Sequence, residues 1–192
     1  SMSLDAITPY LITGSVGALI IAFVLIFNKR LAPFLAPVYS ILQGFCLGGL
    51  SAAMNLRFPG IVLQAFLLTF GICALLLIIY KLKIIKPTEN FKLIVTSATA
   101  GLAFYYLVSF MLSFVGIELP YIHENSTGGI IFSLFVVVLA SMNLVVDFDF
   151  IEQGVAKRVP KYMEWYGAFG LMVTIIWLYV EILRLLAKSR KR

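Results

Sequence analysis

The sequence predicts an all-α protein, a polytopic bundle of helices in a lipid bilayer, because of the amount and the arrangement of its apolar residues. Hydrophobic residues make up 61% of the 192 positions, charged residues only 12%, and the mean hydropathy is +1.02. Soluble domains are about half apolar and about a quarter charged. The uncharged residues form runs of roughly 20, the length that a helix needs to cross the hydrocarbon core. The short segments of alternating polarity that a transmembrane β-barrel needs are absent.

Six of these apolar runs are expected to be membrane-spanning helices. In chain order they cover about Pro9–Phe27, Phe34–Met54, Ile61–Tyr80, Phe91–Ile117, Gly129–Gly154 and a part of Lys161–Leu186. Thr88 is expected to cap the start of the fourth helix, and Gly154 to end the fifth. Gly44 and Gly48-Gly49 predict a face of the second helix that a neighbouring helix approaches closely.

The basic residues predict how the loops are oriented. The net charge is +6, and nine Lys and Arg residues lie in the loops that follow the first, third and fifth helices. The N-terminus and the other two loops carry one, so the three basic loops are expected in the cytoplasm. Six crossings then place the C-terminal tail on the far side, although it is basic as well, so the side of the tail stays open. We expect one domain over residues 1–192, with a cloning remnant at residues 1–2.

Two carboxylates inside the apolar runs, Asp147 and Glu181, are the strongest candidates for a functional site. A charged group at membrane depth costs a few kcal/mol or more, so such groups usually line a pathway or pair with a partner. Asn143 shares a helical face with Asp147, whereas Asp149 points roughly the opposite way and suits a boundary or supporting role. We expect Asp147 and Glu181 to meet in the bundle, to share protons, and to bind a calcium ion when both are charged.

Simpler interpretations of these acids remain open. Glu181 could form a local ion pair with Arg184, three residues further along the helix. Residues 147–152 could form an acidic helix end at the membrane surface. If the two acids do meet, Arg184, Lys29 or Arg30 could neutralise them and hold a closed state.

Several stretches resemble the Bax inhibitor family of membrane proteins, and they occur in the family's order. They are Ala36–Tyr39 with the glycines that follow it, Val145–Ile151, and Leu178–Leu183, which is similar to the Leu-Tyr-Leu-Asp signature of the family's last helix. Residues Asp147–Gly154 and Glu164–Gly167 resemble the bacterial branch of YccA-like proteins. The resemblance covers nearly the whole chain.

This resemblance implies a seven-helix fold whose last helix is central. It also implies a pH-sensitive calcium leak governed by Asp147 and Glu181, in a bacterial inner membrane. The sequence departs from the family in four ways. Six spans are expected instead of seven, so the family's first helix is expected to be missing. The second acid is Glu where the family commonly has Asp, and the connection between the fifth and sixth helices is longer. The family's basic latch position falls at Asn28, so that Lys29 or Arg30 would replace it.

The sequence leaves two functional hypotheses, and neither is an enzyme. The first is a calcium leak channel with the lipid bilayer and calcium ions as partners, and the second is a membrane interaction protein that modulates a membrane protease or another membrane partner. An intramembrane aspartyl protease needs two aspartates, typically one in a Gly-x-Gly-Asp turn, and the last helix has no aspartate. We expect no organic cofactor and no nucleic-acid partner.

Overall fold

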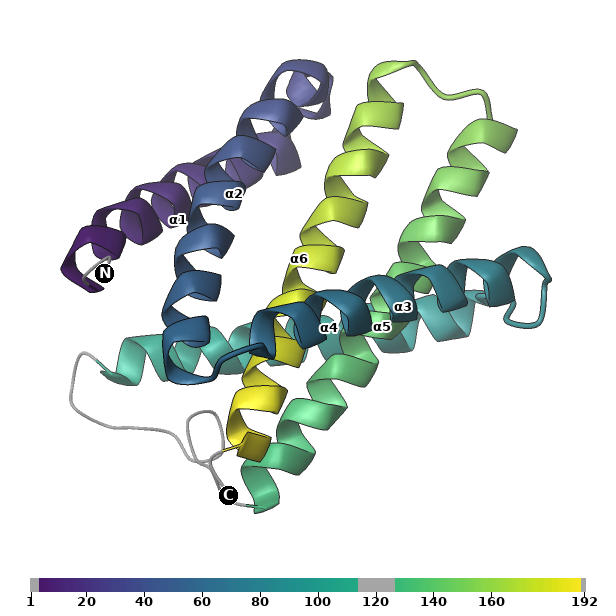
Figure 1. The fold of residues 1–192 in the computed structure, drawn as a ribbon. Helices are drawn as coiled ribbons and strands as arrows, with labels where there is room; N and C mark the ends of the chain where they lie inside the picture. Colours follow the sequence, from purple (N-terminus) through teal and green to yellow (C-terminus); the bar gives the residue numbers. More distant parts are fainter. Residues whose placement is uncertain (1–3, 114–126, 191–192) are drawn as a thin grey trace. The chain divides into compact units, whose positions relative to one another are not determined.

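The computed structural model describes residues 4–113 and 127–190, with side chains described from Gly14 onward, and its regular structure is helical throughout these ranges (Figure 1). The elements are α1 (Leu4–Phe27), the 3-10 helix η1 (Lys29–Leu31), α2 (Ala32–Arg57), α3 (Ile61–Lys81), α4 (Glu89–Ser113), α5 (Thr127–Ala156) and α6 (Tyr162–Arg190). The predicted all-α class is therefore confirmed. The cloning remnant, and the part of the fourth predicted span after residue 113, lie outside the described residues.

Each predicted span is a helix in the structure. Within the described residues five segments are long and apolar enough to cross a membrane: Lys29–Arg57, Ile61–Lys81, Glu89–Ser113, Thr127–Ala156 and Tyr162–Arg190. The first helix has 24 residues, of which the shorter apolar segment Gly14–Phe27 has described side chains. Many large apolar side chains point out of the protein, such as Leu63 and Phe66 of α3 and Leu93 of α4. Such an outer surface suits contact with lipid tails.

The chain divides into two compact units. The first contains Ser1–Gln64 and Phe150–Val173, and the second contains Ala65–Asp149 and Thr174–Arg192. Helices α3, α5 and α6 each contribute to both units. The expectation of a single domain stays a prediction.

In the first unit α1 and α2 pack closely where α1 has glycines. A methyl group added at Gly14 would lie 2.7 Å from the Leu42 carbonyl oxygen and 3.1 Å from the Cys46 nitrogen. A methyl group at Gly17 would lie 2.9 Å from the Leu42 side chain. Next to this contact, the Ser15 hydroxyl lies 3.0 Å from the Cys46 sulfur. The absence of a Cβ on α1 therefore allows the two backbones to approach.

The expectation that Gly44 and Gly48 form the close-packing face of α2 is wrong. A methyl group added at either glycine would meet nothing within 4 Å. The close contact needs a small residue on only one helix, and α1 supplies it at Gly14 and Gly17. A small-residue motif alone does not identify which helix of a pair uses it.

The predicted cap at the start of α4 is present, and a turn closed by a side chain precedes α3. The Phe91 N–H donates to the Thr88 hydroxyl at 3.2 Å, so Thr88 caps α4 as expected. In the turn before α3, the Gly60 N–H donates to the Asn55 side chain at 3.0 Å. Gly60 has a φ of 79°, a left-handed conformation that favours glycine.

Helices α3 and α5 end in a motif that usually needs glycine but here contains a cation. The Val159 N–H donates to the Gly154 carbonyl at 3.1 Å, and an equivalent bond closes α3. The residue in the left-handed position is Arg158, with a φ of 50°, after α5 and Lys83, with a φ of 57°, after α3. The fifth helix thus continues past Gly154 to Ala156. A positive charge at these ends offsets the negative pole of each helix.

In the second unit α4, α5 and α6 share an apolar core. Its buried residues are Val95 and Leu102 of α4 and Val136 and Leu139 of α5, with Trp177 of α6 packed against them. On α6 the consecutive residues 181–183 are all buried, so neighbours enclose this helix on more than one side. Trp177 thereby joins α6 to the apolar core of α4 and α5.

Candidate functional site

A row of polar and charged residues runs along one face of α6 in the second unit. It consists of Thr174, Glu181, Arg184 and Lys188, at intervals of seven, three and four residues, which a helix places on one side. At 1.5 Å per residue the row is about 20 Å long. Charged residues in spanning helices are rare and usually functional, so this row is the candidate site.

Glu181 lies in the middle of the row, in a closed triangle of contacts. Its Oε1 accepts hydrogen bonds from the Tyr106 hydroxyl at 3.2 Å and from the Arg184 Nη1 at 3.1 Å. Arg184 also donates to the Tyr106 hydroxyl oxygen at 3.2 Å. The Glu181 side chain is 3% exposed and that of Arg184 36%, so the negative charge is enclosed and the positive charge is half-open. The local Glu181–Arg184 pair is thus present, and Tyr106 fixes its geometry.

Asp147 of α5 lies at the start of the row, and one of its oxygens has no partner. The Asp147 carboxylate has a hydrogen bond with the Thr174 side chain. Its Oδ2 is inaccessible to solvent and has no hydrogen-bond partner within the described part of the chain. A buried oxygen without a hydrogen-bond donor lowers the free energy of unfolding by about 1–3 kcal/mol, so this carboxylate destabilises the fold. Such a carboxylate can take up a proton or receive a passing cation.

The two supporting residues next to Asp147 have partners on α4. Asn143 donates from Nδ2 to the Thr99 hydroxyl at 2.7 Å and to the Leu139 carbonyl at 2.9 Å. Asp149 accepts a salt bridge from Lys92 at 2.7 Å. Both side chains of that bridge are partly enclosed, with 16% of Asp149 and 20% of Lys92 exposed. These contacts tie α5 to α4 on both sides of Asp147.

Lys188 at the far end of the row was not predicted as a site residue. It is 5% exposed, and its ammonium group donates to the Ser133 hydroxyl at 3.0 Å and to the Gly129 carbonyl at 3.1 Å. Sequence reasoning counted it with the basic tail. Its spacing of seven residues from Glu181 was the available signal, because it places Lys188 on the same face.

The structure does not bring Asp147 and Glu181 into direct contact. Asp147 lies beside Thr174, and Glu181 is two helical turns further along α6, about 10 Å along the axis. The hydrogen bonds of the described residues include none between the two carboxyl groups. Direct sharing of a proton therefore does not occur in this arrangement, and their joint role in pH sensing stays a prediction.

Two of the three cations proposed to neutralise the acids, Lys29 and Arg30, lie in the first unit. Lys29 stands over the ring of Tyr166, 5.1 Å from its centroid, which is a cation–π contact. Arg30 is exposed in η1. Arg184, the third candidate, is the cation that contacts Glu181. Of the three, only Arg184 shares a unit with the acids.

The described residues place no cluster of carboxylates at the expected calcium site of Asp147 and Glu181, and calcium binding there stays a prediction. Calcium takes six to eight oxygen ligands, usually from several carboxylates. Among the described residues no group of three or more His, Cys, Asp or Glu side chains lies close enough to hold a metal ion. Asp147 offers one carboxylate beside one hydroxyl, a donor set that does not fit a tightly bound calcium ion.

A family model described as "Bax inhibitor 1 like" matches residues 1–191. Neither the curated proteins nor the solved structures include a match. The match and the apolar helices agree on an integral membrane protein. The family predicted from the sequence motifs is thereby confirmed, whereas the narrower YccA-like branch stays a prediction.

Proposed function

The chain belongs to the Bax inhibitor 1 like family, and from this premise we propose that it forms a pH-sensitive calcium leak through a membrane. Asp147 and Glu181 are the proposed proton-responsive groups. Calcium is the permeant ion and not a resident ligand, because the donor set at Asp147 is too small to retain it. The proposed location is a bacterial inner membrane, with the loops after α1, α3 and α5 in the cytoplasm.

One observation carries this proposal: the buried Oδ2 of Asp147 that has no hydrogen-bond donor. A structural carboxylate inside a membrane protein is normally satisfied by donors or by a cation. Asp147 keeps half of its hydrogen-bonding capacity unused. This unused oxygen supports a role in receiving protons or cations that move along the polar row.

The contacts of Glu181 support the role of a latch. While Glu181 is ionised, it holds Arg184 and Tyr106 in the closed triangle. A proton on Glu181 removes the charge that binds the Arg184 guanidinium, which is 36% exposed and has room to leave. In this proposal the two acids act in sequence along α6, two turns apart, and not by sharing one proton.

The proposal is tested by calcium flux into liposomes that contain the purified protein, measured over a range of pH. Asp147→Asn and Glu181→Gln are each expected to abolish the pH dependence of the flux. Asp149→Asn is the matched control, because it removes a carboxylate two residues from Asp147 whose partner is Lys92. This control should keep the pH response. An unchanged response in both test variants refutes the proposal.

The same preparation separates this function from the alternative, a protein that modulates a membrane protease or another membrane partner. That alternative predicts no calcium flux from the purified chain at any pH. It also predicts a stoichiometric partner when the tagged protein is recovered from membranes. Flux that follows Asp147 and Glu181 contradicts it.

A further inference from the structure

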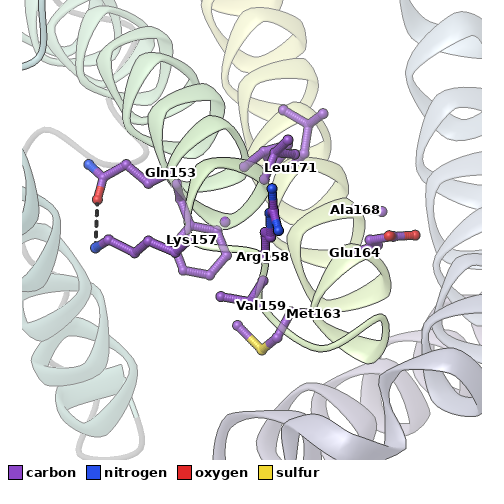
Figure 2. Close-up of a pocket in the computed structure, with 12 residues that line it drawn as sticks. Gln153, Lys157, Arg158, Val159, Met163, Glu164, Ala168 and Leu171 are labelled. Carbon is purple, nitrogen blue, oxygen red and sulfur yellow. Dashed lines mark hydrogen bonds between the residues drawn. The ribbon is translucent and has the colours of Figure 1, made fainter.

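A pocket of about 650 Å³ lies at the end of the α5–α6 hairpin, entirely within the first unit (Figure 2). It is lined by the last residues of α5, the first turns of α6 and the loop between them. This size lies in the range of ligand-binding pockets, roughly 300–1,000 Å³. The proposed leak does not use any of its residues.

The walls of the pocket are mostly apolar and belong to helices that can cross a membrane. Phe150, Ile151 and Val155 line it from α5, and Met163 and Leu171 line it from α6. Both helices are among the segments long and apolar enough to span the bilayer. The deep part of the pocket therefore suits a hydrocarbon chain.

The loop end of the pocket carries positive charge. Lys157 donates to the Gln153 side chain at 3.3 Å, and Arg158 is exposed next to it. Figure 2 shows the Arg158 side chain extending from the loop toward Leu171, whereas the Glu164 carboxylate is directed away from it. Because the Glu164 carboxylate points away from Arg158, the Arg158 guanidinium can contact an anion in the pocket.

Arg158 also has a backbone conformation that glycine adopts more easily. Its φ of 50° lies in the left-handed region, which costs a residue with a side chain about 1 kcal/mol or more. Such a conformation persists where the surrounding structure fixes it, here through the hydrogen bond from the Val159 N–H to the Gly154 carbonyl. Here the side chain is a guanidinium, the donor set that best matches a phosphate.

From these observations we propose that the hairpin pocket binds one anionic phospholipid. The phosphate contacts Arg158, Lys157 adds positive charge at the same loop, and the upper part of an acyl chain lies along Phe150, Val155 and Leu171. Basic pockets between spanning helices near a membrane surface are suited to such lipids. The inference is independent of calcium flux, since no pocket residue belongs to the polar row of α6.

Retention of phosphatidylglycerol by the detergent-purified protein, measured by native mass spectrometry, tests the headgroup. The wild type is expected to retain one phosphatidylglycerol in preference to phosphatidylcholine. The double variant Lys157→Gln/Arg158→Gln is expected to bind it roughly thirty-fold more weakly. Each basic residue near a membrane surface contributes about 1 kcal/mol, and about 1.4 kcal/mol corresponds to a tenfold change in affinity. The matched control is Lys83→Gln/Lys86→Gln, which removes the same charge from the loop after α3 and should keep the lipid.

A second pair of variants tests the apolar part. Ala168→Trp fills the pocket from α6 and should reduce retention of phosphatidylglycerol at least tenfold. Ala103→Trp, at an exposed position of α4, should leave retention unchanged. Glycerol phosphate at millimolar concentration should not displace the lipid, because it has no hydrocarbon chain.

Three outcomes would overturn the proposal. Retention that survives Lys157→Gln/Arg158→Gln shows that the cations do not hold the lipid. Equal loss in the Lys83→Gln/Lys86→Gln control shows a general attraction between basic loops and anionic lipid. Displacement by glycerol phosphate shows an anion site that does not recognise a lipid.

Discussion

Replacing Gly48 by alanine should stabilise the protein, whereas replacing Gly14 by alanine should not. Both glycines lie inside helices, so alanine adds about 1 kcal/mol of helix propensity at either position. At Gly48 the new methyl group meets nothing within 4 Å, so a gain of about 1 kcal/mol remains. At Gly14 it would lie 2.7 Å from the Leu42 carbonyl oxygen, a backbone atom that can move only if α1 and α2 separate. Overpacking of this kind costs about 1–3 kcal/mol, which cancels or exceeds the gain.

The two variants are compared by unfolding in dodecyl sulfate added to mixed micelles, followed by circular dichroism. Gly48→Ala should unfold at a higher detergent fraction than Gly14→Ala, with a difference in unfolding free energy of about 1–3 kcal/mol. Gly44→Ala serves as a second control, because its methyl group would also meet nothing within 4 Å. Equal stability of Gly14→Ala and Gly48→Ala would refute the close approach of α1 to α2.

Three further substitutions test the helix ends and the polar row in the same unfolding assay. Lys83→Gly should stabilise by about 1 kcal/mol, because it relieves a left-handed φ of 57°; a loss would mean that its charge outweighs the strain. Tyr106→Phe should destabilise by about 1.5–3 kcal/mol, since it removes the hydroxyl that binds Glu181; no change would show that the triangle contributes nothing. Lys188→Met should cost about 2 kcal/mol by removing the donor to Ser133, and a more stable variant would show that burying the ammonium costs more than its bonds contribute.

The sequence predicted the helices well because their signals are local. A run of about 20 apolar residues has few alternatives to a spanning helix, and the third helix begins at Ile61 as expected. The cap at Thr88 was equally accessible, because its hydroxyl reaches an N–H three residues away. The end of α5 was harder to predict, because Arg158 adopts a left-handed conformation that sequence rules assign to glycine.

Contacts between helices depended on information that local patterns lack. Glycines mark where a close approach can occur but not which neighbour uses it, so Gly14 and Gly48 cannot be distinguished by sequence alone. Asp149 was expected to have a boundary or supporting role, yet its partner Lys92 lies 57 residues earlier and no local rule joins them. No local rule joins Tyr106 of α4 to Glu181 of α6 either, although the Tyr106 hydroxyl donates to the Glu181 carboxylate.

The register of α5 against α6 determines which residue of α5 lies opposite each residue of the polar row on α6. In the second unit Asp147 lies beside Thr174, and Ser133 contacts Lys188. Moving fourteen residues back along α5 thus corresponds to moving fourteen residues forward along α6. Both pairs therefore report one antiparallel register, which is held from Asp147 to the far end of the row.

This register places Glu181 level with Ala140 and not with Asp147. It could have been estimated from the sequence, because a short loop forces the residues on either side of its centre to lie level. With α5 ending at residue 156 and α6 beginning at 162, the loop centre is residue 159. Asp147 precedes that centre by twelve residues and Glu181 follows it by 22, so this estimate separates the two acids by ten residues, or about 15 Å, whereas the Asp147–Thr174 contact gives seven residues, or about 10 Å. Two acids on neighbouring helices of one hairpin therefore lie at different depths along the helix pair, and this offset is why Asp147 and Glu181 do not touch.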